Sequence, residues 1–317
     1  MKVFIIGGTG LLGSNLVPRL VESNHDVTVL TRYSDKKEFL EKIGASCKIG
    51  DILHPEAFQK NINQPELIIF IAMPPIQPGR VNRKKFLHLK EITTKYFQNS
   101  MNLAKQYSCP IILTLGTNYH SDTDQVFSEI NPIQRFGMPK IGEDIDRPVN
   151  ESLEKGNPSC IVMMPGQIYG PGGLFMTMYK WIKSGKYRII GQGNNFVPHI
   201  YVEDLAEAYI AAIEKMPLGE KFIIADDTPC TVNDFAQEIA SGLKLPPIKH
   251  VPKFIVRLVV GKLLFQTITM NCRVSNEKAK RVLGWSPNYS YKDGIKETIK
   301  KIESKQAVVL KNNITKE

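Results

Sequence analysis

A glycine-rich turn near the N-terminus constrains this chain more than any other feature. Residues 2–6 form an apolar stretch typical of a buried strand, the sequence GGTGLLG follows at residues 7–13, and residues 14–23 read as a helix. Asp26 to Leu30 is a second apolar strand, so the first thirty residues predict a strand–turn–helix–strand unit. Glycines at such a turn permit a tight bend and let the backbone approach a pyrophosphate, which the helix N-terminus meets with its N–H groups. The turn therefore predicts a dinucleotide site.

Strand and helix patterns keep alternating through the first half of the 317-residue chain. Strands are expected at 67–72, 110–115 and 160–164, and helices at 84–106 and 137–154. This alternation predicts an α/β fold, a doubly wound parallel (Rossmann-type) sheet. Beyond Pro165 the pattern changes, with a glycine-rich loop expected at 167–173, helices at 175–184, 202–215, 232–242 and 292–304, an apolar stretch at 254–270, and short strands. We predict an NADP-binding domain at 1–168 plus about 196–226, a smaller mixed α/β C-terminal substrate domain at 169–195 and 227–305, and a tail at 306–317.

Composition narrows the function classes. Lys and Arg exceed Asp and Glu by 41 − 31 = 10, and the densest cluster is Arg80, Arg83, Lys84, Lys85, His88 and Lys90. No recognised nucleic-acid module accompanies this charge, so we expect a solvated surface and no nucleic-acid partner. The five cysteines are scattered without a CxxC pair, which predicts no metal site and a reducing, cytoplasmic location. Apolar runs are too short for a membrane span, and no cleavable signal is apparent.

The end of the second strand selects the cofactor. An acidic residue there would bond the adenosine ribose and indicate NAD, but this chain has Thr31 followed by Arg32. An arginine can pair with a 2′-phosphate, so NADP is favoured over NAD, although Arg32 could equally be a surface residue. Asp51, after the third strand, could accept a hydrogen bond from the adenine amino group or cap the following turn.

Five stretches together resemble the extended short-chain dehydrogenase/reductase family, also called the NAD-dependent epimerase/dehydratase family. They are the turn at 7–13, Gly50-Asp51-Ile52, Ile168-Tyr169-Gly170-Pro171-Gly172, the segment 199–206 (HIYVEDLA) and the segment 283–287 (LGWSP). The resemblance covers residues 1 to about 300 and implies an active site between the two domains. It implies these cofactor-binding residues: Gly7, Thr9, Gly10, Leu11, Leu12, Gly13, Thr31, Arg32, Asp51, Ile52, Ala72, Lys140, Pro165, Gln167 and Ile168.

Catalysis in that family uses a Tyr-x-x-x-Lys pair together with a Ser or Thr. Lys140 matches the lysine and Thr117 best matches the hydroxyl residue, but Phe136 stands where the tyrosine is expected. A phenyl ring cannot transfer a proton, so another group has replaced the tyrosine or the chemistry differs. His120 and Tyr119 are the first candidates for the replacement, because they follow a strand that should end at the cleft. Tyr169, His199 and Tyr201 are candidate substrate residues, with a structural role as the alternative.

The prediction about the substrate rests on two arginines that this sequence lacks. Nucleotide-sugar enzymes of the family place an arginine just before the segment at 196–200 and another before Arg273, and neither is present here. The apolar stretch 254–270 could wall a pocket for an apolar substrate, pack in the core or touch a membrane surface. We therefore expect an NADP-dependent reductase, epimerase or dehydratase that acts on a small molecule other than a nucleotide sugar. A homodimer is possible. A non-catalytic NADP-binding sensor or assembly protein, and a nucleotide-sugar epimerase/dehydratase, remain the alternatives.

Overall fold

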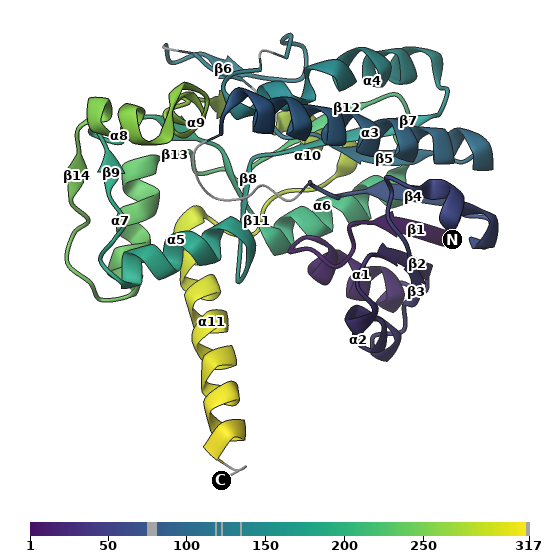
Figure 1. Cartoon of the computed structure of the whole chain (residues 1–317), viewed down its shortest axis with the longest axis horizontal. Coiled ribbons are helices and arrows are strands. Elements are labelled where there is room, and N and C mark those ends of the chain that lie inside the picture. The colour runs from purple at the N-terminus through teal and green to yellow at the C-terminus, as the bar shows by residue number, and fades with distance from the viewer. Residues whose placement is uncertain (75–80, 118, 122, 134, 315–317) are drawn as a thin grey trace.

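A seven-stranded parallel sheet forms the centre of the molecule (Figure 1). The computed structural model describes residues 1–74, 81–117, 119–121, 123–133 and 135–314, with the backbone alone described at 61 and from 305 onward. The strand order is β12-β7-β5-β4-β1-β2-β3, so the chain reverses direction across the sheet between β1 and β4. The strands are β1 (Lys2–Ile6), β2 (Asp26–Thr31), β3 (Ser46–Ile49), β4 (Leu67–Phe70), β5 (Ile111–Thr114), β7 (Cys160–Pro165) and β12 (Lys221–Ile224).

Helices cover both faces of this sheet, which is why its central strands are apolar throughout. On one face, α1 (Gly13–Glu22) and α6 (Val202–Lys215) enclose a core that includes Leu16, Val17 and Leu205. On the other, α3 (Arg83–Tyr107) and α4 (Glu143–Lys155) enclose a second core that includes Phe97 and Val149. Two shorter helices, α2 (Lys37–Lys42) and α10 (Glu277–Leu283), lie beside the sheet's strands β3 and β12. The predicted doubly wound fold is confirmed.

The later part of the chain builds a smaller region from short strand pairs and helices. The pairs are β8 (Gln167–Tyr169) with β11 (His199–Tyr201), β9 (Ile189–Ile190) with β14 (His250–Val251), β10 (Phe196–Val197) with β13 (Cys230–Thr231), and β6 (Val126–Phe127) with β15 (Arg273–Val274). The helices are α5 (Gly173–Lys183), α7 (Val232–Gly242), α8 (Lys253–Val260) and α9 (Lys262–Ile268). The 3₁₀ turns lie at Ser34–Lys36, Pro55–Ala57, Gln59–Asn61 and Met138–Gly142. The domain division itself stays a prediction.

Three segments differ from the sequence prediction. The helix expected at 137–154 begins only at Glu143, because Gly137 has φ +69° and Pro139 follows it, so residues 138–142 form a 3₁₀ turn. The apolar stretch 254–270 contains two helices, because Gly261 breaks it with φ +79°. Residues 167–169, expected in a loop, form strand β8.

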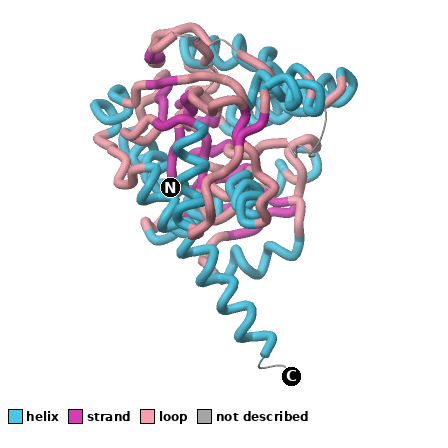
Figure 2. The backbone as a smooth tube through the Cα atoms, turned by 90° about the vertical axis from the view of Figure 1, so that its left-hand side faces the viewer, coloured by secondary structure: helices cyan, strands magenta, loops and turns pink. Residues whose placement is uncertain are grey.

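The last helix, α11 (Tyr291–Ile314), continues ten residues past the predicted end at Ser304. No proline and no glycine follows Gly294, so no helix-breaking residue stops it near Ser304. Figures 1 and 2 show its C-terminal half projecting from the body of the molecule. The residues expected to form an irregular tail are therefore helical as far as Ile314.

Several expectations about composition can be placed on this fold. All five cysteines are free thiols. The described part of the chain holds no helix with the length and apolar character of a membrane span, and no cluster of three or more His, Cys, Asp or Glu side chains arranged for a metal ion. Of the basic cluster at 80–90, Arg80 lies outside the described residues, and Lys90 pairs with Asp144 at 3.0 Å.

Candidate active site

The glycine turn brings the N-terminus of α1 to the carboxyl edge of the sheet. Gly7 follows β1 with φ +97°, and a Cβ there would stand 2.6 Å from the backbone nitrogen of Ala72, which follows β4. At Gly13 a Cβ would stand 2.2 Å from the carbonyl oxygen of Gly8, so α1 and the turn meet backbone to backbone. Gly10 is exposed, and a Cβ there would meet nothing closer than 3.4 Å, which leaves open space above the turn. These close approaches fit a pyrophosphate cradle.

Leu11 joins this turn to the segment after β8. Its side chain lies beside Gly170, Gly172 and Gly173, where an added Cβ would stand 3.2–3.7 Å from a Leu11 methyl carbon. Pro165, at the end of β7, accepts a hydrogen bond from the Thr117 N–H at 3.1 Å. The predicted cofactor residues Thr9, Leu12, Gln167 and Ile168 lie in the same turn and the same β8 segment.

The end of β2 carries Thr31 and Arg32 as predicted. Thr31 is buried and its hydroxyl accepts the Tyr33 N–H at 3.2 Å, whereas the Arg32 side chain is 41% exposed. The Arg32 guanidinium lies 3.9 Å from the Asp51 carboxylate, and Asp51 also accepts the Leu53 N–H at 2.9 Å. Asp51 therefore has the turn-capping contact, and the Arg32 side chain is accessible to solvent. Asn99 from α3 fixes this loop by donating to the Ile52 carbonyl at 2.8 Å.

Of the catalytic candidates, His120 is in direct contact with Phe136. The His120 ring stacks on the Phe136 ring with centroids 4.0 Å apart and planes 13° apart. His120 Nδ1 accepts the backbone N–H of Asn271 at 3.1 Å, which places the proton of the neutral ring on Nε2. Thr117 is buried after β5, and Lys140 is half-buried on the 3₁₀ turn that follows Phe136.

Helix α9 docks on the loop that carries Phe136 and Lys140. The Thr267 hydroxyl accepts the Met138 N–H at 2.7 Å and donates to the Leu263 carbonyl at 2.9 Å. A Cβ at Gly137 would stand 2.5 Å from that hydroxyl oxygen, so only glycine fits there. The sequence did not single out Thr267, because a lone threonine in an apolar helix carries no recognisable motif.

Asn271 ties the His120 loop to the smaller region, and sequence reasoning missed it as well. Its side chain donates to the Ser121 carbonyl at 2.8 Å and accepts the Phe196 N–H at 2.8 Å. Its carbonyl accepts the Ser121 N–H at 3.0 Å. Asn271 therefore holds both the His120 ring and the backbone of Ser121, the next residue.

The remaining aromatic candidates lie in the core. Tyr119 is fully buried against Phe127, and burial raises its pKa to about 12. Burial lowers the pKa of His199 to about 3, and its ring stacks on Phe235 at 3.9 Å. Burial raises the pKa of Tyr169 and also that of Tyr201, whose hydroxyl accepts from Lys301 at 3.1 Å. This placement favours a structural role for these four side chains and leaves His120 as the candidate beside Phe136.

Asp226, just beyond β12, is a further buried polar group that the sequence did not single out. Burial raises the pKa of its carboxyl to about 7, and its Oδ2 has no hydrogen-bond partner among the described residues. Its backbone N–H donates to the His199 carbonyl at 2.8 Å. Asp226 thus belongs to the interior behind β8 and β11.

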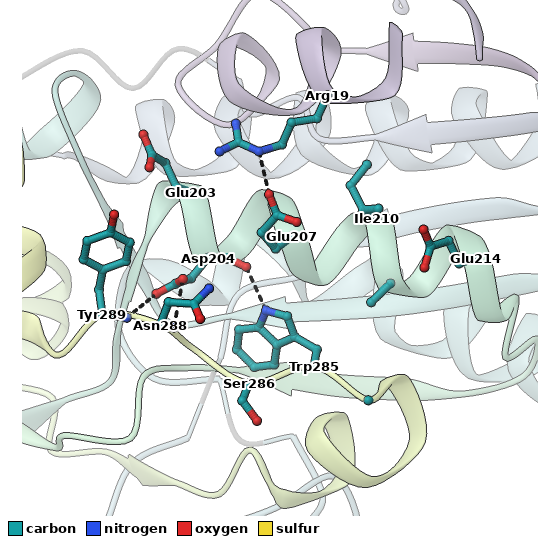
Figure 3. A pocket seen from close by; sticks show the side chains of 12 residues that line it. Arg19, Glu203, Asp204, Glu207, Ile210, Glu214, Trp285, Ser286, Asn288 and Tyr289 are labelled. Carbon is teal, nitrogen blue, oxygen red and sulfur yellow. Dashed lines mark hydrogen bonds and ion pairs between the residues drawn. The ribbon is translucent and has the colours of Figure 1, made fainter. Parts of the chain in front are cut away.

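A hollow of about 850 Å³ lies elsewhere, between α1, α6 and the segment 284–289 (Figure 3). None of the predicted site residues lines it. Arg19 pairs with Glu207 at 2.7 Å, and Asp204 accepts the N–H groups of Asn288 and Tyr289, both at 3.0 Å. The ion pair joins α1 to α6, and the Asp204 contacts attach the segment 284–289 to α6. The hollow lies outside the candidate active site.

A doubly wound parallel sheet with a glycine turn between its first strand and first helix is the architecture of dinucleotide-binding proteins. The model of the NAD dependent epimerase/dehydratase family matches residues 3–225, and the chain belongs to that family. The mouse sterol-4-alpha-carboxylate 3-dehydrogenase, decarboxylating, is 24% identical over 94% of this chain and 90% of its own length.

Solved structures show the same fold. The UDP-glucose 4-epimerase from Thermotoga maritima, determined with UDP-glucose, has a TM-score of 0.79 and 20% identity, covering 97% of this chain and 100% of that one. The human epimerase family protein SDR39U1 (isoform2), determined with NADPH, has a TM-score of 0.74 and 19% identity, covering 94% and 99%.

Proposed function

We propose that this protein is an NADP-dependent reductase of a carbonyl group on a small, uncharged and partly apolar substrate. The observation that carries the proposal is the stack of His120 on Phe136, which puts an imidazole against the ring at the family's tyrosine position. The family membership and the NADPH bound by the human SDR39U1 structure support the cofactor class. Arg32, exposed beside Asp51, supports the preference for a 2′-phosphate.

His120 acts in this proposal as a neutral hydrogen-bond donor. Because Nδ1 accepts from Asn271, Nε2 carries the proton of the neutral ring, and in this proposal that N–H donates to the oxygen of a bound substrate. A neutral imidazole can stabilise the charge that develops on a carbonyl oxygen without giving up its own proton. The Thr117 hydroxyl is the second donor to the same oxygen.

Bound NADPH supplies the hydride that the carbonyl carbon gains. Lys140 orients the nicotinamide ribose, and its ammonium is the source of the proton that the substrate oxygen gains. Lys140 recovers that proton from water, so the protein ends each cycle unchanged. The half-buried apolar side chains of α9, which docks on the Lys140 loop through Thr267, supply the wall for the apolar part of the substrate.

Two variants test the proposal. His120→Phe keeps a ring stacked on Phe136 but removes the donor, and we expect kcat to fall by about 10²–10³, as when one oxyanion donor is lost. Phe136→Tyr should raise kcat by less than about tenfold, because His120 already covers that ring's face. NADPH oxidation with a panel of ketones and aldehydes measures both, and Tyr119→Phe is the control that should keep full turnover.

Other outcomes decide against the proposal. Full turnover in His120→Phe together with a hundredfold gain in Phe136→Tyr would show that His120 has not replaced the tyrosine. NADPH binding by the wild-type protein without turnover of any carbonyl compound would instead favour the non-catalytic NADP-binding alternative.

A nucleotide-sugar epimerase or dehydratase is the second candidate, and one observation favours it. The Arg273 guanidinium lies over the Phe196 ring at 3.7 Å, and its buried Nε has no partner among the described residues. Such a cation could pair with a substrate phosphate. A saturable thermal shift with a nucleotide sugar, beyond that of the cofactor and lost in Arg273→Gln, would decide for this candidate.

A further inference from the structure

Helix α8 presents an apolar face that the described part of the chain leaves uncovered. Phe254, Leu258 and Val259 are 67%, 76% and 68% exposed, and Ile255 is 42% exposed. At 100° per residue these four side chains lie on one side of the helix, opposite the half-buried Val256 and Val260. Four large apolar side chains together on one helix face indicate an interaction surface.

The charged residues in the sequence around α8 indicate the charge of the partner. No Asp or Glu occurs between Glu238 and Glu277, whereas Lys244, Lys249, Lys253, Arg257, Lys262 and Arg273 lie in that stretch. Both basic residues of α8 are exposed, with Arg257 at the edge of the apolar face beside Phe254 and Lys253 on the opposite side of the helix. The partner therefore combines an apolar layer with negative charge.

We propose that α8 lies on an anionic membrane surface, with its apolar face between the lipid chains and its basic residues at the headgroups. An amphipathic helix with basic residues beside a large apolar face binds in this way. The net charge of +10 on the whole chain adds to the attraction.

Two other occupants fit the surface less well. A second copy of this chain would face α8 with α8 across a two-fold axis, which sets a basic stretch without acidic residues against the same stretch. A nucleic acid would meet four apolar side chains where it needs polar contacts to its backbone. The inference goes beyond the proposed enzyme activity and does not depend on it.

The test is co-sedimentation of the full chain with vesicles. We expect binding to phosphatidylcholine vesicles that contain about 30 mol% phosphatidylserine, at least tenfold tighter than to phosphatidylcholine alone. The double variant Leu258→Ser with Val259→Ser should weaken binding at least tenfold, because it removes two apolar side chains from the lipid. Arg257→Gln should weaken binding about fivefold, and only to the anionic vesicles.

Ile130→Ser is the matched control, because Ile130 is 93% exposed in a loop outside α8. It should bind vesicles as the wild-type protein does, and thermal melts should show all variants folded. The proposal is overturned if the wild-type protein ignores anionic vesicles, or if the α8 double variant binds them unchanged. It is also overturned if sedimentation velocity shows a dimer that the double variant abolishes while no protein binds vesicles.

Discussion

The glycine turn at residues 7–13 and the Phe136 loop at residues 135–142 make up the two halves of the candidate site, and different contacts constrain them. At the turn, Gly7 and Gly13 bring backbone against backbone, to distances that no side chain tolerates. At the loop, a separate helix sets the fit, since Gly137 faces both the hydroxyl and the backbone nitrogen of Thr267, and Phe136 faces the His120 ring.

Under the proposed function, this difference accounts for a chain that keeps the family's fold with Phe136 at the expected tyrosine position. A cradle for pyrophosphate is made of main chain, so it changes only if the glycines change. The proton-handling group is one side chain among several near the cleft, and a neighbouring ring can occupy its place. The turn is therefore constrained by contacts close to it in the sheet and α1, and the loop by contacts with α9 and the His120 ring.

The largest expected effect tests the constraint at the turn. Gly13→Ala places a methyl 2.2 Å from the Gly8 carbonyl oxygen, which must displace α1 and its buried Leu16 and Val17. We expect a loss of more than about 3 kcal/mol of stability, measured by urea denaturation. Gly10→Ala, with 3.4 Å of space, is the control and should stay folded. Equal stability of Gly13→Ala and Gly10→Ala would show that close backbone contact does not constrain the turn, and would contradict the comparison of the two halves.

Gly137→Ala tests the other half. The methyl collides with Thr267 and should displace α9 from the Lys140 loop, lowering kcat/KM about a hundredfold, as small misplacements at a site can. Global stability should fall by only about 1–2 kcal/mol, the strain of alanine at φ +69°. Gly185→Ala has φ +68° with no atom within 4 Å, so it measures the strain alone. A similar loss of kcat/KM in Gly185→Ala would contradict the role of the Thr267 contact.

The next prediction tests whether the buried Asp226 carboxyl is protonated in the folded protein, from the dependence of stability on pH. The folded pKa of about 7 lies above the unfolded value of about 3.9, so the folded state binds more protons and loses stability as pH rises towards 7. The wild-type protein should lose about 2 kcal/mol between pH 5.5 and pH 7, a loss that Asp226→Asn escapes. Asp227→Asn, at the exposed neighbour, should keep the wild-type slope. Parallel slopes for all three proteins would show that Asp226 ionises freely.

The smallest expected effect concerns Arg32 and the preference for NADPH over NADH. Arg32→Ala should weaken NADPH binding about tenfold and leave NADH binding unchanged, because it removes one exposed charge that pairs with a phosphate. Fluorescence titration with both cofactors measures this, and Lys36→Ala, at another exposed basic side chain, is the control. A wild-type protein with equal affinity for both cofactors would contradict the NADP preference.

Much of the fold could be predicted because its signals are local. The alternation of strands and helices predicted the parallel sheet, and the bounds of α6 and α7 agree with the prediction. At α7 the reason is a capping box at Thr231. Its hydroxyl accepts the Asp234 N–H, and the Asp234 carboxylate accepts the Thr231 N–H. The local rules failed where a glycine with positive φ divided a helical pattern, as at Gly137 and Gly261.

For the candidate site, the sequence by itself determined the glycine cradle, Thr31 with Arg32, and the phenylalanine at the tyrosine position. Only the tertiary structure decided that His120 stacks on Phe136, that Asn271 sets its tautomer, and that Thr267 supports the Lys140 loop. Asn271 and His120 are 151 residues apart, and Thr267 and Met138 are 129 apart. A local motif encodes the backbone of its own few residues, whereas such distant pairs meet only through the packing of the whole chain.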